Sequence, residues 1–323
     1  MSIGSSNSRC GVTSGTGPAT VEVGVDTARW LFRVHDESQQ RAAQHLCGES
    51  PMKLGEGTTA GWMESFETLW VEGRAVQALV PGSKALLPPA ALGDVHEELR
   101  KQLAAVGLTD TRPMGPSRLD VTATVRTAAA ADGWAVLRGM NLLDVPRRKS
   151  SIITSRGQPQ TVYKLTERGQ VRERIYDKGV ERGDAPQGQL IRFEAQTRHP
   201  KATRTTVEHW TMERIRETYE HRFAPMARSA DGLHVASEKV VRRMIREHVE
   251  AGRISARQAE LLLGHMAVES VGIPTPRRTK FRRRAELRRL GLALALDGDG
   301  DEATDVDLPA VLEDVLTSPG WRA

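Results

Sequence analysis

Three segments near the middle of the chain carry chemically active side chains at every second position. They are RLDVTATV (118–125), VRERIYDK (171–178) and LIRFEAQTR (190–198). Side chains of a β-strand point alternately to its two faces, so residues i, i+2 and i+4 share a face. If the strands share a sheet, one face gathers a tyrosine, two carboxylates and several cations: Tyr176, Asp120, Glu194, Arg118, Arg172, Arg174, Lys178, Arg192 and Arg198. A surface of this composition is suited to phosphodiester chemistry.

Each residue type has a role in such chemistry. The carboxylates of Asp120 and Glu194 can hold Mg²⁺ or Mn²⁺, which polarises a phosphate and stabilises the leaving oxygen. A phenol, with a pKa near 10, is a weak nucleophile at neutral pH. We expect Lys178, Arg174 or the metal to favour the phenolate of Tyr176 and so activate it. The other interpretation is a structural tyrosine among cross-strand ion pairs.

The chain has three tyrosines, which narrows the choice of nucleophile. Tyr163 has Thr161 and Leu165 at its i±2 positions and so lacks charged neighbours on its face. Tyr219 falls in a segment with a helical, mixed-charge pattern. Tyr176 is therefore the candidate nucleophile.

The surrounding pattern predicts the elements that position these residues. Ile191, Phe193 and Ala195 form an apolar face opposite the charged one, as expected for a sheet with one buried side. Further strands are expected near 69–71, 75–80, 150–154 and 160–166, and helices near 37–47, 88–108 and 127–140. The fold class is therefore α+β, an antiparallel-rich mixed β-sheet with helices on one face, followed by a helical C-terminal region.

The C-terminal region has two features typical of nucleic-acid binding. Helices are expected at 237–251 and 256–269, joined by a short turn with Gly252, which fits a helix-turn-helix or an ordinary helical hairpin. The segment 276–290 holds eight Arg or Lys residues against one acid, Glu286. This density favours sequence-independent phosphate binding. The residues expected to bind DNA there are Arg277, Arg278, Lys280, Arg282, Arg283 and Arg284.

Composition agrees with a nucleic-acid partner and excludes several other classes. The net charge is +5, and 37 of the 46 basic residues are arginines, whose planar guanidinium matches phosphate oxygens. No apolar stretch approaches the roughly 20 residues that span a bilayer, and the amino terminus lacks a secretory pattern. A cytoplasmic protein without membrane contact is expected. Cys10 and Cys47 have no CxxC partner, which argues against disulfides and thiolate zinc.

The order and spacing of RLDVTATV, TVYKLTERGQVRERIYDKGVE (161–181) and IRFEAQTR (191–198) resemble the replication initiation factors of rolling-circle plasmids and phages. That family has R-[LI]-D on one strand, then R-I-Y-x-K-x-x-E, then R-[VF]-E. The resemblance implies a site-specific nicking and closing enzyme whose tyrosine stays linked to the 5′ phosphate and leaves a 3′ hydroxyl. Carried over, the nucleophile is Tyr176, followed by Lys178 and Glu181, and the carboxylates are Asp120 and Glu194.

The chain departs from the family pattern at two positions. Thr124 and Gln196 stand where many members have further acids, so the metal site is expected to be thinner, or completed by Asp177 or Asp26. No two of the nine histidines are separated by a single residue, so the His-x-His metal motif of other rolling-circle nickases is absent.

Composition and periodicity set the expected organisation, and the resemblance adds the expected partners. The expected division is a disordered tail (1–20), a nicking domain (21–215), a helical, basic DNA-binding region (216–290) and an acidic C-terminal tail (291–323). Expected partners are origin DNA, single-stranded or in a hairpin, a host helicase and a second copy of the chain.

Two other functions fit parts of the pattern. A non-catalytic plasmid or phage regulator would keep the basic run but would not need Tyr176, and binding without strand breakage would identify it. A relaxase or recombinase would keep tyrosine chemistry, but recombinases place the tyrosine in a helical domain. Phosphate-loop NTPase activity is excluded because neither Gly15-Thr-Gly17 nor Gly55-Glu-Gly57 continues into GK[ST].

Overall fold

A nine-stranded antiparallel sheet is the centre of the fold in the computed structural model, which describes residues 21–48, 50–183, 185–198, 210–270, 276–294 and 305–322. The strand order is β2-β3-β4-β1-β5-β9-β8-β7-β6. The strands are β1 (Val21–Val34), β2 (Met52–Gly55), β3 (Thr58–Met63), β4 (Thr68–Arg74), β5 (Thr111–Arg126), β6 (Arg148–Ser155), β7 (Gln158–Thr166), β8 (Val171–Asp177) and β9 (Leu190–Arg198). The long strands β1, β5 and β9 lie at the middle of the sheet and hold its two halves together.

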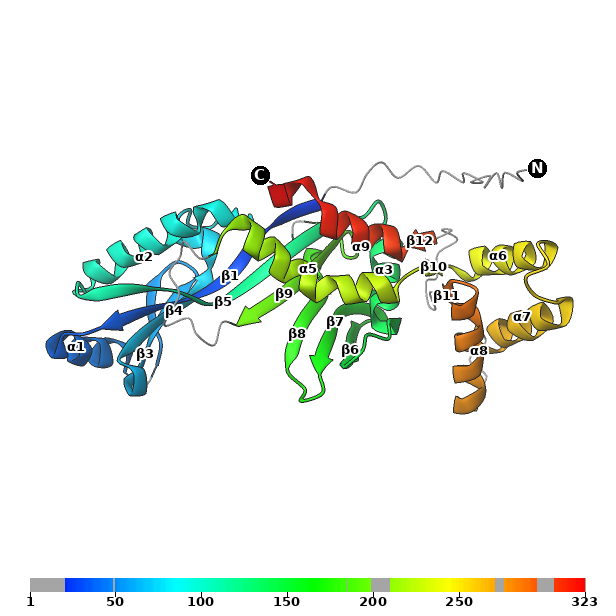
Figure 1. The fold of residues 1–323 in the computed structure, drawn as a ribbon, viewed down its shortest axis with the longest axis horizontal. Coiled ribbons are helices and arrows are strands. Elements are labelled where there is room, and N and C mark those ends of the chain that lie inside the picture. Colours follow the sequence, from blue (N-terminus) through cyan, green and yellow to red (C-terminus); the bar gives the residue numbers. More distant parts are fainter. Residues whose placement is uncertain are drawn as a thin grey trace, which may run out of the picture.

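Helices cover one face of this sheet (Figure 1). They are α1 (Glu37–Cys47), α2 (Leu92–Ala105), α3 (Ala130–Leu142), α5 (Met212–Ser229) and α9 (Leu308–Thr317). The apolar positions of β9 face them: Phe193 meets Phe223 of α5 edge-on at 5.9 Å between ring centroids. Tyr219 of α5 donates its hydroxyl to the Phe193 carbonyl over 3.2 Å. This architecture confirms the α+β class predicted from the strand and helix periodicities.

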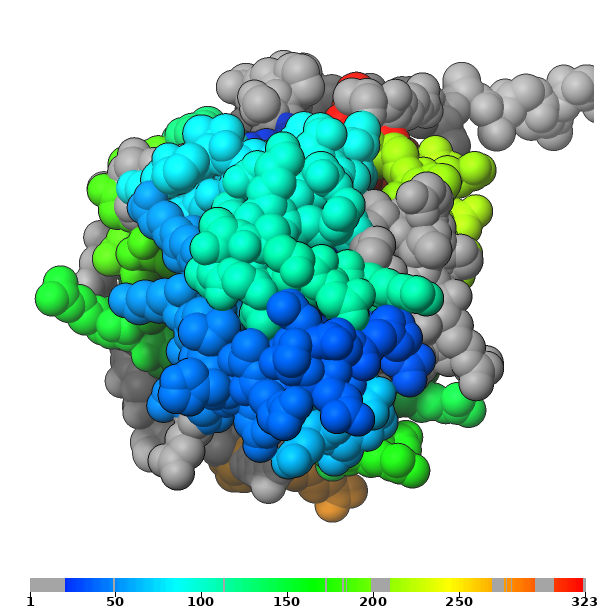
Figure 2. Space-filling model, turned by 90° about the vertical axis from the view of Figure 1, so that its left-hand side faces the viewer, coloured from blue at the N-terminus to red at the C-terminus, as the bar shows by residue number. Residues whose placement is uncertain are grey.

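The ends of α1 and α2 follow from local sequence. Asp36 precedes α1 and accepts a hydrogen bond from the backbone N–H of Gln39, as an N-cap does. Gly107 has a φ of 89° just after α2, a conformation that a residue with a Cβ rarely adopts. Figure 2 views the molecule from this end, where the blue α1 and the blue-green α2 form much of the surface.

A smaller unit follows α5 and projects beyond the end of the large sheet (Figure 1). It comprises β10 (His234–Ala236), α6 (Glu238–Glu250), α7 (Ala256–Ser270), α8 (Arg277–Arg289), β11 (Leu292–Leu294) and β12 (Asp305–Asp307). It has its own core, built from apolar residues of the three helices and the neighbouring strands. The helical pair predicted at 237–251 and 256–269 is therefore present as α6 and α7, and its use in DNA reading stays a prediction.

The structure differs from the expected organisation at the carboxyl end. The boundary expected at residue 215 falls inside α5, whose apolar residues pack on the large sheet. Residues 305–322 were expected to belong to an acidic tail, and that part of the prediction is wrong. Leu308, Leu312, Val315 and Trp321 are buried in the main core because α9 has an apolar side that fits the sheet. The expected tail at 1–20 and the acidic stretch 297–302 lie outside the described residues.

Two further local differences concern the amino-terminal half. The strand expected at 75–80 is a 3₁₀ turn, Ala75–Ala78. The hairpin of β2 and β3 was not predicted, because its short strands lack a long alternating pattern. In the parts of the chain that the structure describes, no helix combines the length and apolar character needed to cross a membrane.

Candidate active site

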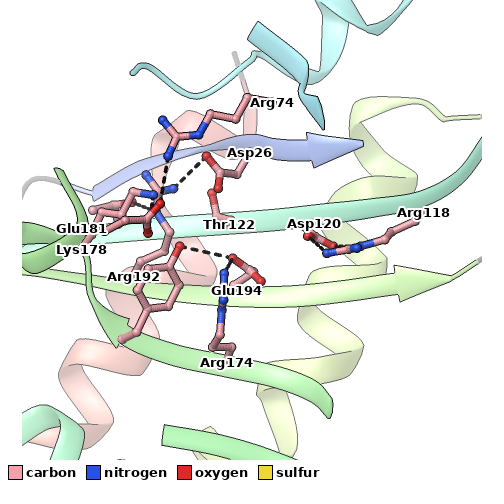
Figure 3. Close-up of polar contacts among 12 residues, drawn as sticks. Asp26, Arg74, Arg118, Asp120, Thr122, Arg174, Lys178, Glu181, Arg192 and Glu194 are labelled. Carbon is pink, nitrogen blue, oxygen red and sulfur yellow. Dashed lines mark hydrogen bonds and ion pairs between the residues drawn. The ribbon is translucent and has the colours of Figure 1, made fainter. Parts of the chain in front are cut away.

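The predicted polar residues meet on the face of β5, β9 and β8 opposite the apolar positions of β9. Strand register places Glu194 between Thr122 of β5 and Arg174 of β8. The same register places Tyr176 beside Arg192, and Asp120 beside Gln196. Figure 3 shows Asp120, Glu194 and their arginine partners on adjacent strands. The tyrosine and both carboxylates therefore share one face of the sheet, as the alternation in the sequence predicted.

Tyr176 lies on strand β8, as predicted, but it is covered. Its side chain is 5% exposed, and its hydroxyl donates to Oε2 of Glu194 over 3.3 Å. The Arg174 guanidinium lies 4.4 Å from the ring centroid and the Lys178 ammonium 5.7 Å. The phenol is therefore held between a carboxylate and two cations.

Burial of Tyr176 acts against the activation that its neighbouring cations were expected to provide. Burial and the Glu194 carboxylate raise the pKa of Tyr176 above its ordinary value, and Arg192 and Arg174 offset this only in part. Removing a phenol from water penalises its charged form, and a carboxylate next to it adds repulsion. Tyr176, the predicted nucleophile, is thus a neutral phenol with a carboxylate in contact.

Glu194 has an electrostatic environment suited to accepting that proton. Burial and the nearby Asp120 carboxylate raise the pKa of Glu194. Arg174 Nη2 donates to the same Oε2 atom over 2.9 Å and stabilises the charged form. A carboxylate with a raised pKa is a stronger base than an exposed one.

Asp120 is the second carboxylate of the predicted metal pair. Burial raises the pKa of Asp120, although Arg118 donates from Nε to its Oδ1 over 2.9 Å and partly offsets the effect. Arg118 also donates from Nη1 to Glu72 of β4 over 2.8 Å, and Glu72 pairs with Arg29 of β1. Sequence reasoning missed Glu72 and Arg29, although the polar positions within TLWVEGR were a signal for an outward charged face.

A β-bulge brings a third carboxylate to this face. The register of β1 against β5 shifts between Val25 and Thr27, which leaves Asp26 as the extra residue. Oδ1 of Asp26 lies 3.0 Å from Nη1 of Arg192. Figure 3 shows Asp26 next to Thr122 and Arg192. Asp26 therefore remains a candidate for completing the site.

Asp177, the other residue expected to complete the site, has a different role. Its Oδ1 accepts from the backbone N–H of Gly179 over 3.0 Å and its Oδ2 from that of Gly188 over 2.6 Å. It is the N-cap of the short helix α4 (Lys178–Arg182). The strand alternation directs it away from the face that holds Tyr176, which rules out the ligand role.

Lys178 and two partners border the site on the α4 side. Lys178 is buried, and its Nζ lies 2.8 Å from Glu181. Burial and the neighbouring Arg192 lower the pKa of Lys178. Arg74, at the end of β4, donates to the other oxygen of Glu181 over 2.9 Å. Arg74 was not predicted because it is 107 residues from Glu181 in the chain and only the fold brings them together.

The arginines predicted to bind DNA occupy different environments. Arg192 is fully buried and donates from Nε to Thr124 over 3.0 Å, whereas Arg198 is exposed and donates to Gln196 over 3.3 Å. Arg174 and Arg118 are partly exposed. The side chains of Arg172, Arg277 and Lys280 lie outside the described part of the structure. Thr124 and Gln196, the two departures from the family pattern, thus serve as neutral acceptors for arginines.

The donor set fits a metal that binds together with a substrate. Among the described residues, no group of three or more His, Cys, Asp or Glu side chains is close enough to hold an ion. Asp120 and Glu194 are both buried, and the Asp120 carboxylate contributes to the raised pKa of Glu194. Mg²⁺ is often held by one or two carboxylates, with water and substrate phosphate oxygens as the other ligands. The pair is therefore compatible with Mg²⁺ or Mn²⁺.

Comparison with known proteins adds a weak structural likeness. No protein-family model matches the chain. No curated protein matches it either. Among solved structures, a rolling circle replication initiator protein from Geobacillus stearothermophilus is similar to it, with 15% identity, a TM-score of 0.31, and coverage of 57% of this chain and 76% of that one.

Proposed function

We propose that the chain is a rolling-circle DNA replication initiator that nicks and rejoins its origin strand through Tyr176. The observation that carries the proposal is the contact between the Tyr176 hydroxyl and the Glu194 carboxylate, beside Asp120. A tyrosine with a base in contact is the arrangement that nucleophilic catalysis requires. The sequence pattern of the three strands supports the same assignment.

The chemistry starts with transfer of the phenol proton to Glu194. The phenolate oxygen of Tyr176 then attacks the phosphorus of the scissile phosphate, a P–O bond to tyrosine forms, and the bond to the 3′ oxygen breaks. The 3′ oxygen leaves and takes up a proton, and the 5′ phosphate stays on Tyr176. The reverse reaction rejoins the strand because the phosphotyrosine conserves the bond energy.

Arginines and the metal pair would stabilise the charge that develops. Arg174 and Arg192 flank Tyr176 and can stabilise the negative charge that develops on the phosphate oxygens in the transition state. A divalent ion held by Asp120 and Glu194 would polarise the phosphate and stabilise the leaving oxygen.

The substrate must also reach a tyrosine that is covered at rest. Arg74 and Glu181 form a partly exposed ion pair beside Lys178. Exposed pairs of this kind contribute only about 0–1 kcal/mol, so a phosphate can replace Glu181 as the partner of Arg74 at little cost. Arg74 would then hold the DNA strand near Tyr176.

The decisive experiment compares wild type with Tyr176→Phe on supercoiled plasmid that carries the DNA flanking the gene, with Mg²⁺ or Mn²⁺. We expect metal-dependent nicking and a covalent adduct to the 5′ end in the wild type, and neither in the variant. Tyr163→Phe is the matched control, because Tyr163 is on neighbouring strand β7 and should be dispensable. Cleavage that survives in Tyr176→Phe and is lost in Tyr163→Phe would move the assignment.

A non-catalytic DNA-binding regulator is the second candidate. Two observations favour it: Tyr176 is buried with a raised pKa, and the basic helix α8 lies outside the sheet domain. A wild-type protein that shifts origin DNA in gels, without nicking or crosslinking it under any metal condition, would establish this function. The helicase partner and a second copy of the chain remain expectations of the initiator proposal.

A further inference from the structure

Helix α8 presents a single large aromatic side chain to solvent. Phe281 is 77% exposed, more than any other large hydrophobic side chain in the described ranges. The opposite side of α8 is fixed against the small core, where Leu287 is buried. Arg283 is also nearly buried, and its Nη1 donates to Glu286 over 2.6 Å. Phe281 therefore faces outward because the rest of α8 is anchored.

The surroundings of Phe281 are cationic. Residues three and four apart share a helix face, so Arg278 and Ala285 lie on either side of its ring, and Arg282 is the next residue along the chain. All three are exposed. The one acid of α8, Glu286, is engaged by Arg283. The outward face of α8 is therefore a positive surface with one aromatic ring, and the small Ala285 leaves space beside that ring.

We propose that this face binds single-stranded DNA, with one base stacked on Phe281 and neighbouring phosphates held by Arg278 and Arg282. The inference rests on the proposed function and deepens it by assigning base stacking to Phe281. An aromatic ring flanked by cations is the common arrangement for sequence-tolerant binding of single strands. A lone exposed phenylalanine needs no explanation by itself, and it is the arginines around it that point to a polyanion.

Charge and shape favour a single strand over the other polyanions. In duplex DNA the base faces are covered, so Phe281 would have to wedge between base pairs at a cost of unstacking. An anionic membrane surface attracts helices with a broad apolar stripe, whereas this face has one large apolar residue. An unpaired strand offers both accessible base faces and phosphates.

The test measures binding of fluorescein-labelled oligo(dT) and of an abasic oligonucleotide of equal length, by fluorescence anisotropy across a salt series. Phe281→Ala should weaken oligo(dT) binding about tenfold and leave the abasic strand unchanged, because only a base can stack. Phe281→Trp should retain oligo(dT) binding. Arg282→Ala should weaken both strands and reduce the salt slope by about 0.7, the value for one phosphate contact on a single strand.

Phe66→Ala is the matched control, since Phe66 is 65% exposed in the 3₁₀ turn Glu64–Phe66, far from α8 in the sequence. It should bind both strands as the wild type does. The inference fails if Phe281→Ala binds oligo(dT) normally, or loses the abasic strand equally. If Phe281→Ala weakens binding to a duplex of the same length as much as binding to oligo(dT), Phe281 inserts between base pairs. If the variant loses only binding to anionic vesicles, α8 is a membrane-binding helix. Both outcomes also overturn it.

The assay separates this inference from the proposed function. It is run in EDTA and in a Tyr176→Phe background, so it requires no nicking. A base-dependent effect of Phe281 without any nicking by the wild type would sustain the binding face and reject the nuclease. Nicking by the wild type without a base-dependent effect of Phe281 would reject the binding face and sustain the nuclease.

Discussion

Glu194→Gln tests the most specific claim about the site, which is that Glu194 receives the proton of Tyr176. The substitution keeps the shape and an oxygen that can still accept the hydroxyl, but it removes the basic carboxylate. General-base catalysis contributes roughly 100- to 10,000-fold, so single-turnover nicking should fall by that factor. The affinity for the same DNA should change little, because Glu194 is buried and contacts Arg174. A carboxylate repels phosphate, so its loss should not weaken DNA binding.

The pH dependence gives the sign of the effect. A base must be ionised to act, so nicking by the wild type should fall as the pH drops through the pKa of Glu194. Burial and Asp120 raise that pKa, so the decline should begin above pH ~4.5, the ordinary value for a glutamate. In Glu194→Gln this limb should disappear. The pKa of Tyr176 should also fall, because Glu194 is one cause of its elevation.

Two measurements distinguish a base at Glu194 from a residue that only supports the fold or only holds metal. Glu194 is buried and Arg174 is partly exposed, so the substitution removes one charge of a mostly buried ion pair, and urea unfolding of the variant measures how much of any lost nicking is a loss of stability. If Glu194 only holds metal, excess Mn²⁺ should restore nicking with the original pH limb. Such full restoration would refute the base role and leave Glu194 as a ligand.

Two further predictions concern neighbouring charges. Asp120→Asn should raise the Mn²⁺ concentration for half-maximal nicking at least tenfold, measured by metal titration of nicking. DNA binding in EDTA, measured by anisotropy, should be unchanged. An unchanged Mn²⁺ concentration for half-maximal nicking would remove Asp120 from the metal pair. Burial lowers the pKa of Lys164 on β7 from its ordinary 10.5 to about 8. Between these two pH values the unfolded chain binds a proton at Lys164 that the folded protein does not. The free energy of unfolding should therefore rise by about 3 kcal/mol from pH 8 to 10.5. The rise should be missing in Lys164→Met when urea unfolding is compared at each pH, and an equal rise in both proteins would contradict the assigned cause.

Strand alternation was sufficient to predict the central part of the site. The period of two in the segments around Asp120, Tyr176 and Glu194 specifies which side chains share a face, and sheet register then brings them together. The helix at 37–47 was predicted to the residue, and the Asp36 that caps it is its neighbour in the chain. Such features depend on residues close in the chain, and a single sequence reports them directly.

Other parts of the site depend on contacts between distant segments and could not be predicted. Asp26 reaches Arg192 only because β1 has a bulge opposite Val121, and nothing in VEVGVDTARW specifies a register shift. The direction of the Tyr176 pKa shift depends on burial, which a period of two does not reveal. The return of α9 to the large sheet likewise depends on an apolar surface that other segments build.

The charges of the site bear on how the proposed metal would bind. Three acids, Asp26, Asp120 and Glu194, are each paired with an arginine, namely Arg192, Arg118 and Arg174. A buried group of this kind is close to neutral, so a divalent cation arriving alone would leave two uncompensated positive charges in a poorly hydrated place.

A phosphodiester supplies one negative charge, and loss of the tyrosine proton supplies the second when that proton passes from Glu194 on to solvent; the two together would balance that cation. Metal, DNA and loss of the tyrosine proton should therefore stabilise one another. Extra acids at the positions of Thr124 and Gln196 would favour metal binding without DNA. Thr124 and Gln196 are neutral and accept from Arg192 and Arg198, so the proposed initiator would bind metal only together with a substrate strand.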